Sequence, residues 1–263
     1  MNKIQAIVRK EWAQVYRNRL VLLSIVFMPL LFTAIPLIIL YTTRDMGSGT
    51  AGATEVPPQF AQICSADMVG AECFQYYMVS AFMLMFMMTP LIIPVNIAAF
   101  SIVGEKTTRS LEPLLATPIT TVELLAAKNL AATIPAVLAT WLGFGLFLVG
   151  ALLITTSNRL VSALLNPMWL VAVLVVGPLL AILSVNFSMM VSSRVNDPRV
   201  AEQLSALVIL PLLALFFGQI SGFIVVNQRV VLLMAAVLLL LDSGLIWLAV
   251  RLFERETILT RWR

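Results

Sequence analysis

The sequence predicts an all-α membrane protein with six transmembrane helices. Hydrophobic residues make up 60% of the 263 positions and charged residues only 11%, whereas soluble domains carry about 25% charged residues. Apolar runs of about 20 residues, long enough to cross a hydrocarbon core of about 30 Å, recur six times along the chain. The polar segments between these runs hold most of the charges. A lipid-embedded bundle is the fold that fits these observations.

Each span is predicted from the limits of its apolar run. Asn166-Pro167 and Asp197-Pro198 each place an N-cap residue before a proline at the first helical position, which is a strong helix-start signal. Residues 218–229 are too short to cross the membrane, so they form either a re-entrant hairpin or a tight outer loop. The six predicted spans are 20–41, 76–100, 129–154, 168–191, 198–217 and 230–250.

The distribution of basic residues predicts the topology. An even number of spans places both termini on one side of the membrane. Fourteen of the 17 Lys and Arg residues lie in the two terminal segments, in 101–128 or in 193–202, and only Arg44, Arg159 and Arg229 remain in the opposite loops. Basic residues accumulate on the cytoplasmic side. We therefore expect a multi-pass protein of the cell (inner) membrane with cytoplasmic termini.

The first 19 residues are basic and amphipathic. Apolar side chains recur there at helical spacing, a pattern typical of a helix that lies in the membrane interface. The same basic segment could begin a signal peptide, but the apolar run that follows is too long and lacks a cleavage site. We expect an interfacial helix over 1–19, an uncleaved first span, and a charged cytoplasmic tail over 251–263.

Several kinds of chemistry are excluded or weakened by composition. The chain has no histidine, which removes Ser-His and Cys-His nucleophile pairs and the commonest metal ligand. Cys64 and Cys73 lie in the outer loop 42–75 without CxxC spacing, so we predict no metal site. On the oxidising side of the membrane these two cysteines form one disulfide or remain two free thiols. The topology accounts for the net charge of +4, and nucleic acid is not an expected partner.

The segment 101–128 is the most polar part of the chain between spans. Glu105 and Arg109 have the favourable i,i+4 order for a helical ion pair. Thr120 and Glu123 fit a capping box, with Pro118 ending whatever precedes them. The pattern predicts a helix–turn–helix with an apolar leucine patch. A solvated connector is the alternative, but connectors in bundles are usually about 2–8 residues long.

The run "EKTTRSLEPLLATPITTVELLAAK" resembles the signature of the ABC-2 family of ABC transporter permeases. Two departures are Arg109-Ser110, where Gly-Thr is usual, and Ala127, where glycine precedes the final lysine. The tail "LFERETIL" is also similar to the family's usual ending. The matching positions are Glu105, Lys106, Glu112, Leu114, Leu115, Thr117, Pro118, Ile119, Thr120, Glu123 and Lys128.

This resemblance implies a type V exporter fold, in which 101–128 is a coupling helix that docks on a separate ABC ATPase subunit. It also implies that two six-span units pair, as a homodimer or with a closely related permease. ATP and Mg²⁺ would be bound by the partner subunit, and no cofactor by this chain. The implied docking residues are Glu105, Lys106, Arg109, Glu112, Leu114, Leu115, Thr117, Pro118, Thr120 and Glu123.

The chain carries no ATP site of its own. The stretch "GEKTT" lacks the G-x4-G-K-[ST] spacing of a P-loop, since Glu105 separates Gly104 from Lys106 and Ala99 stands where the first glycine belongs. No catalytic constellation was found, so we expect no enzymatic activity from the isolated chain. An intramembrane enzyme is the least favoured alternative.

Two features of the spans bear on the cargo. Asp242 is the ionisable residue well inside a span, and it has either a functional role or a structural one, protonated or bonded to Ser243. Span two is rich in methionine, which suits a hydrophobic or amphiphilic cargo but also suits ordinary packing. The leading function is an ABC exporter permease. A stand-alone secondary transporter or channel is the alternative, and it would need ion-coordinating residues near the midplane.

Overall fold

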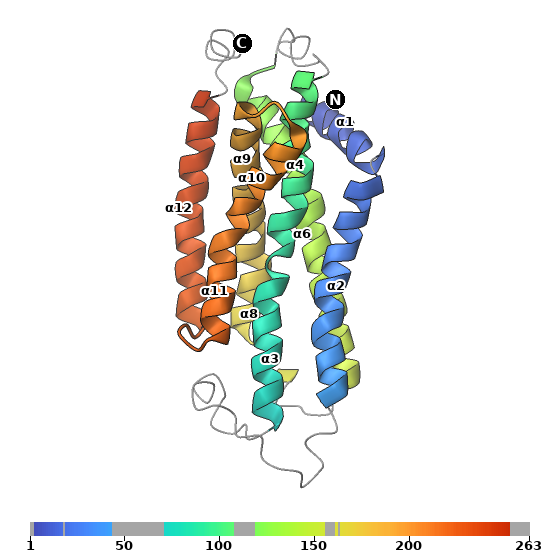
Figure 1. The fold of residues 1–263 in the computed structure, drawn as a ribbon, viewed down its shortest axis with the longest axis vertical. Helices are drawn as coiled ribbons and strands as arrows, with labels where there is room; N and C mark the ends of the chain where they lie inside the picture. The colour runs from blue at the N-terminus through green and yellow to red at the C-terminus, as the bar shows by residue number, and fades with distance from the viewer. Residues whose placement is uncertain are drawn as a thin grey trace.

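The computed structural model describes a long helical bundle in which the first described helix and the C-terminal end of the last one lie at the same end of the molecule (Figure 1). All regular structure within the described residues is helical, and six of the helical stretches are long and apolar enough to cross a membrane. The predicted fold class is therefore confirmed. The described residues are 3–17, 19–43, 71–107, 119–155, 161–162 and 164–252.

The spans are assembled from several helical pieces. The first, third and last spans are single helices, whereas the second, fourth and fifth each change helix type or break within the span. The elements are α1 (Lys3–Arg17), α2 (Arg19–Thr43), α3 (Ala71–Phe86), α4 (Thr89–Thr107), α6 (Thr121–Ile154), α8 (Pro167–Val171), the π-helix η2 (Ala172–Val176), α9 (Gly177–Arg194), α10 (Pro198–Ser205), the 3₁₀-helix η3 (Ala206–Ile209), α11 (Leu210–Ile220) and α12 (Gln228–Leu252).

The second span breaks at Met87–Met88, between α3 and α4. Pro90 has no N–H to bond the carbonyl of Phe86, and its ring clashes with that carbonyl in a continuous helix. The Met88 carbonyl instead accepts the N–H of Leu91 and of Ile92, at 3.1 and 2.9 Å, as α4 begins. The break lies in the middle of the most buried span of the bundle.

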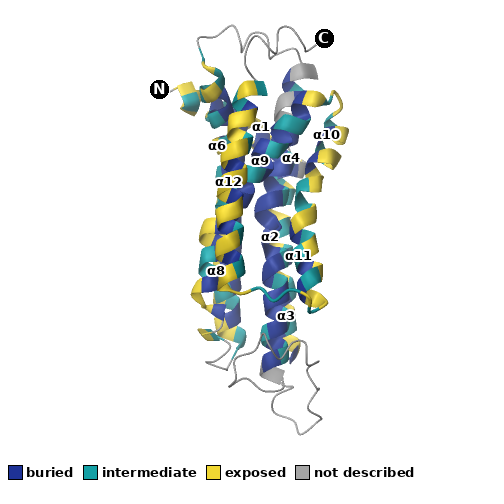
Figure 2. Ribbon diagram, turned by 90° about the vertical axis from the view of Figure 1, so that its left-hand side faces the viewer, coloured by how far each residue is buried: buried dark blue, intermediate teal, exposed yellow. Residues whose placement is uncertain are grey.

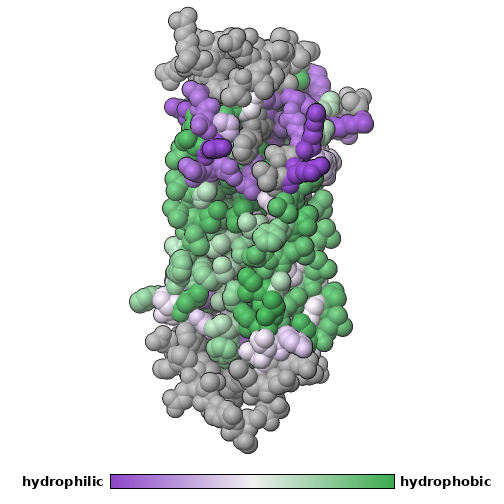
Figure 3. All heavy atoms as spheres, turned by 45° about the vertical axis from the view of Figure 1, so that its right-hand side comes forward, coloured by the Kyte–Doolittle hydropathy of each residue, from purple (hydrophilic) through white to green (hydrophobic). Residues whose placement is uncertain are grey.

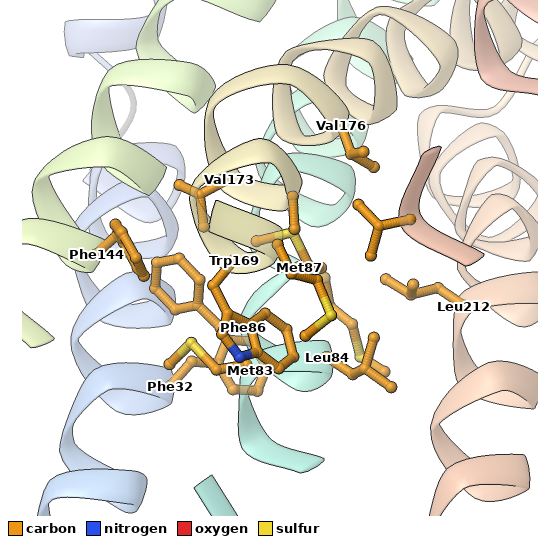
Figure 4. Close-up of a cluster of buried hydrophobic side chains, with 14 of the residues drawn as sticks. Phe32, Met83, Leu84, Phe86, Met87, Phe144, Trp169, Val173, Val176 and Leu212 are labelled. Carbon is orange, nitrogen blue, oxygen red and sulfur yellow. The ribbon is translucent and has the colours of Figure 1, made fainter. Parts of the chain in front are cut away.

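A cluster of aromatic and methionine side chains surrounds this break (Figure 4). Met83, Met87 and Met88 are almost fully buried and belong to one apolar cluster with Phe86 and Trp169. Methionine fills irregular gaps because its chain is flexible and polarisable. This burial favours the packing interpretation of the methionine-rich span over a cargo-binding one.

Small hydroxyl side chains join the two central helices, α4 and α9. Ser184 Oγ donates to the Leu91 carbonyl at 2.7 Å, and Ser192 Oγ donates to the Ala99 carbonyl at 2.8 Å. Ser192 Oγ also accepts the N–H of Val103 at 3.1 Å. Small residues permit close approach of helices in lipid, where hydrogen bonds between helices hold them together. This pair of helices forms the centre of the bundle, which is dark in Figure 2, while α12 is largely exposed.

Proline also explains the π-helix in the fourth span. Pro178 cannot donate a backbone hydrogen bond, and the N–H of Gly177 reaches back to the Ala172 carbonyl. The Val173 carbonyl then accepts the indole N–H of Trp141 on α6 at 3.2 Å. A side chain of the third span therefore satisfies a backbone group that the π-turn releases.

The helix-start signals are confirmed where the structure describes them. Asn166 caps α8 by accepting the N–H of Met168, and Asp197 caps α10 by accepting the N–H of Arg199. At the other end of the fifth span, α11 ends at Ile220 and residues 221–227 lead directly into α12. The connection between the two helices is short, and its assignment as a re-entrant hairpin or a tight outer loop stays a prediction. Gly222 takes a positive φ of 76° there, a conformation that glycine adopts without steric cost.

The close approach of α6 to α2 and α3 at Gly143 is testable. A Cβ placed there would lie 3.1 Å from Pro29 Cβ and 3.2 Å from the Phe86 ring, whereas Gly145 has no atom within 4 Å. We expect Gly143→Leu to destabilise the detergent-solubilised protein by about 1–3 kcal/mol through overpacking. Gly145→Leu, on the same helix, is the matched control and should unfold at the wild-type temperature. Equal thermal stability of both variants would contradict this packing.

Candidate functional site: a buried ion-pair network at the polar end

The described charged side chains concentrate at the end of the bundle that carries α1. Figure 3 shows an apolar band across the molecule and a strongly hydrophilic belt at that end. Glu11, Glu105 and Lys128 lie in this region but are buried, with 4–5% of each residue exposed. Buried charges are costly unless they are paired, so their partners decide what this end of the protein does.

Lys128 and Glu105 are at the centre of a four-residue network. Lys128 Nζ lies 2.8 Å from Glu11 Oε1 and 3.0 Å from Glu105 Oε2. Lys10 Nζ donates to Glu105 Oε1 at 2.9 Å, and its side chain remains 40% exposed. Two acids and two bases thus alternate as Glu11, Lys128, Glu105 and Lys10. The formal charges of the network sum to zero.

The network joins three elements that are remote in sequence. Lys10 and Glu11 belong to α1, Glu105 lies in the last turn of α4, and Lys128 lies in the third turn of α6. Because a buried, paired charge cannot leave its partners without a large desolvation cost, the middle of α1 is held to the end of α4 and to the N-terminal part of α6. The network therefore fixes α1 against the ends of the second and third spans.

Apolar contacts surround the network and strengthen the α1–α6 contact. Ile7 packs against Leu124 and Ala127 of α6, and Trp12 Nε1 donates to the Ala131 carbonyl at 3.0 Å. The buried positions of α1 recur at helical spacing, as the sequence indicated. The apolar face that the sequence assigned to the membrane interface thus contacts α6 over part of its length.

The predicted capping box is confirmed at the start of α6. The N–H of Glu123 donates to Thr120 Oγ1 at 3.2 Å, and the N–H of Thr120 donates to Glu123 Oε2 at 2.8 Å. Each side chain satisfies a backbone donor that has no partner within the helix. The cap fixes where the polar segment ends and the long third span begins.

The third span extends well beyond the length that a bilayer requires. α6 has 34 residues, which corresponds to about 51 Å at 1.5 Å per residue, whereas a bilayer core is about 30 Å thick. Its capped N-terminal end reaches the polar end of the molecule, where α1 packs against it (Figure 1). This extension allows Lys128 to meet the charges of α1 and α4.

The network borders the segment that the sequence predicts as a docking element. α4 ends at Thr107 and α6 begins at Thr121. The network and the capping box therefore lie at the helix ends that flank the intervening residues. Glu105 is a network member whose carboxylate is buried, and any part it plays in docking acts through Lys10 and Lys128. Arg109, Glu112, Leu114, Leu115, Thr117, Pro118 and the Lys106 side chain lie outside the described residues.

Polar contacts continue from the network into the bundle. Asn129 Nδ2 donates to Asn186 Oδ1 at 3.0 Å, and Thr133 Oγ1 donates to Asn129 Oδ1 at 3.1 Å. Asn186 Nδ2 donates to the Ile182 carbonyl of its own helix at 3.0 Å. These amides join the third span to the fourth next to Lys128, so Asn186 connects the two helices.

Two further predicted residues lie away from this site. Asp242 is buried in α12 on the membrane-spanning part of the helix. Cys73 is buried at the start of α3 and is disulfide-bonded; Cys64 lies outside the described residues, so their pairing stays a prediction. Within the described part of the chain, no group of three or more His, Cys, Asp or Glu residues converges as a metal site would require.

Comparison with known protein families identifies the chain. A family model described as ABC-2 family transporter protein matches residues 5–243. The chain belongs to the ABC-2 family of transporter proteins. The match runs from α1 through Asp242 in α12, so it covers the ion-pair network and five complete spans. A search of curated protein sequences found no match.

Membership of the ABC-2 family explains the composition and the fold together. ABC-2 proteins are membrane permeases of ABC transporters, and this chain has the six apolar helices that such a permease requires. The family normally works with an ABC ATPase subunit. The sequence missed the network itself, although two signals were present: Glu11 is the only acid of its basic segment, and Lys128 lies inside the apolar run of α6.

Removing the charge of Lys128 tests how much the network contributes to the free energy of unfolding. Lys128→Met leaves the Glu11 and Glu105 carboxylates buried without their shared cation, and we expect a loss of about 3–5 kcal/mol in the free energy of unfolding. Thermal denaturation in detergent measures the change. Adding Glu11→Gln and Glu105→Gln to Lys128→Met should recover most of the stability, because no buried charge is then left unpaired.

Lys3→Met provides the matched control on the same surface. Lys3 Nζ lies 4.0 Å from Glu123, and its side chain is about half exposed. We expect a change of about 0–1 kcal/mol for this exposed ion pair. Wild-type stability of Lys128→Met, or equal effects of both lysine substitutions, would show that the network is not a structural clamp.

Proposed function

We propose that the chain is the permease subunit of an ABC exporter and that a separate ABC ATPase drives it by docking on residues 101–128. The observation that carries this proposal is the position of the ion-pair network. It lies at the two helix ends that flank the docking segment, where α4 and α6 are held to α1. Because both flanking helix ends are held in place, a displacement of the docking segment moves the spans.

The proposed coupling proceeds through packed and paired groups. A displacement of the docking segment acts on the end of α4 and on the capped start of α6. Lys128 and Glu105 keep these two ends together with α1, and the Asn129–Asn186 bond passes the displacement to the fourth span. ATP and Mg²⁺ belong to the partner subunit in this proposal, and this chain contributes the mechanical link and the membrane pathway.

We further propose that the polar end of the bundle faces the cytoplasm. The bias of Lys and Arg toward this end supports that orientation. Both ends of the described chain, at α1 and at α12, lie there in Figure 1. The protein would then reside in the cell (inner) membrane with its docking segment accessible to a cytoplasmic ATPase.

The proposed cargo is hydrophobic or amphiphilic, and the proposed assembly is a pair of permeases. The side chains of the described spans are mostly apolar. α2, α11 and α12 expose large apolar side chains on the outside of the bundle. The methionines of the second span are buried in the packed core, so they do not count as evidence for a hydrophobic cargo. A pathway between two copies would use the outer faces instead of the packed centre.

Docking is tested by co-purification with the ATPase. We expect the affinity-tagged wild-type permease to retain an ABC ATPase subunit, and Glu112→Lys or the pair Leu114→Asp and Leu115→Asp to release most of it. Phe223→Ala is the control, because Phe223 is 89% exposed at the opposite end of the bundle and should leave ATPase retention unchanged.

The same experiment separates the two candidate functions. A stand-alone secondary transporter or channel would purify without an ATPase and would transport in its absence. Retention of the ATPase by the Glu112 and leucine variants would contradict the docking role of the segment while leaving family membership intact.

A further inference from the structure

Asp242 is a carboxyl group without a partner in the middle of the last span. It lies on α12 and is only 5% exposed, and neither of its carboxylate oxygens has a hydrogen-bond partner among the described residues. The neighbouring Ser243 hydroxyl donates to the Leu239 carbonyl at 2.7 Å. The Ser243 hydroxyl is therefore not the hydrogen-bond partner of Asp242 that the sequence allowed.

Asp242 lies well inside the last span, away from both ends of α12. It is fourteen residues from Gln228, the first residue of α12, which is about 21 Å along the helix. On the buried face of α12, Leu238 belongs to the large apolar cluster on the outer side and Ala249 to a second cluster nearer the polar end. Asp242 lies between these two apolar clusters.

No charged group faces Asp242 from the helices against which α12 packs. Its principal contacts are with α9, η2, α6 and α8. The charged residues of those elements are Glu123, Lys128 and Arg194, and all three lie in the polar end of the molecule. Arg229 and Arg251 are at the two ends of α12 itself. An ionised carboxylate at Asp242 would thus have neither a counter-ion nor a hydrogen-bond donor in the part of the chain that the structure describes.

An unpaired charge in hydrocarbon is among the most unfavourable arrangements in a protein. A neutral carboxylic acid avoids that cost, because its oxygen carries a proton instead of a charge. The lipid-facing neighbours Leu239, Leu240 and Leu241 are at least half exposed, so lipid surrounds the helix next to the buried acid.

We propose that Asp242 is a proton-binding site in the interior of the membrane, held as the neutral acid while α12 packs on α9. Ionisation requires water to enter the contact between α12 and α9, because no group among the described residues near Asp242 can replace water as the partner of the charge. The ligand of the site is a proton, and the site is independent of the ATPase-docking function proposed above.

Carbodiimides of opposite solubility test this proposal. A carbodiimide reacts with a protonated carboxyl group: the acid's proton passes to one nitrogen, the carboxyl oxygen bonds to the central carbon, and the acyl group then shifts to nitrogen. The whole reagent is added and nothing leaves, so peptide mass spectrometry locates the stable N-acylurea. Lipid-soluble dicyclohexylcarbodiimide enters the bilayer, whereas a cationic water-soluble carbodiimide does not.

The experiment uses the full chain in lipid nanodiscs, with any subunit that co-purifies. We expect Asp242 to be labelled about tenfold or more faster by the lipid-soluble reagent than by the water-soluble one, since the site is reached from lipid and not from water. Asp197 is the internal control with the opposite preference, because it is an exposed N-cap carboxylate. Asp242→Glu should keep the lipid-soluble labelling and Asp242→Asn should abolish it.

Four results would overturn the proposal. Asp242 could fail to react with the lipid-soluble reagent, or could react equally fast with both reagents, which would mean that it is ionised or wetted. Millimolar Na⁺ at constant pH could protect it, which would make a metal cation the ligand. A large fall in the unfolding temperature of Asp242→Asn would show that the fold requires a charge at this position, since an amide has nearly the shape of the neutral acid.

Discussion

The buried ion-pair network of Lys10, Glu11, Glu105 and Lys128 is the constraint on which the polar end of this permease depends. Each charge is tolerated only because its partners are present, so α1, α4 and α6 cannot separate at this point without exposing an unpaired group. The apolar contacts of Ile7 with α6 add to the clamp but would permit sliding. Charge pairing therefore holds the helix ends on either side of the predicted docking segment together.

The centre of the bundle follows a different rule from its polar end. Serine hydroxyls hold α4 against α9, and an indole N–H satisfies a carbonyl released by the π-turn beside Pro178. Prolines break or distort the second and fourth spans at positions where neighbouring side chains occupy the freed space. Rigid pairing at one end and locally irregular helices in the middle are compatible with the coupling proposed above.

Sequence patterns predicted the features that depend on neighbouring residues. The six apolar runs, the capping box of Thr120 with Glu123 and the caps at Asn166 and Asp197 are all local, and each is present in the structure. The network was not predictable in this way, because Lys10 and Glu105 are 95 positions apart and Glu11 and Lys128 are 117 apart. Pro90 and Pro94 look alike in sequence, yet only Pro90 ends a helix, since Pro94 lies inside α4. The side chains that surround the break come from helices remote in sequence, so the local pattern does not distinguish the two prolines.

The rigidity of the clamp during the transport cycle is the most direct test. Spin labels at Gln14 on α1 and Val122 on α6 occupy exposed positions on two of the clamped helices, and pulsed electron resonance measures the distance between them in the permease–ATPase complex. We predict one narrow distance distribution that is the same without nucleotide and during ATP hydrolysis. A second distance, or a shift when ATP is added, would show that α1 and α6 move independently and that the network does not couple them.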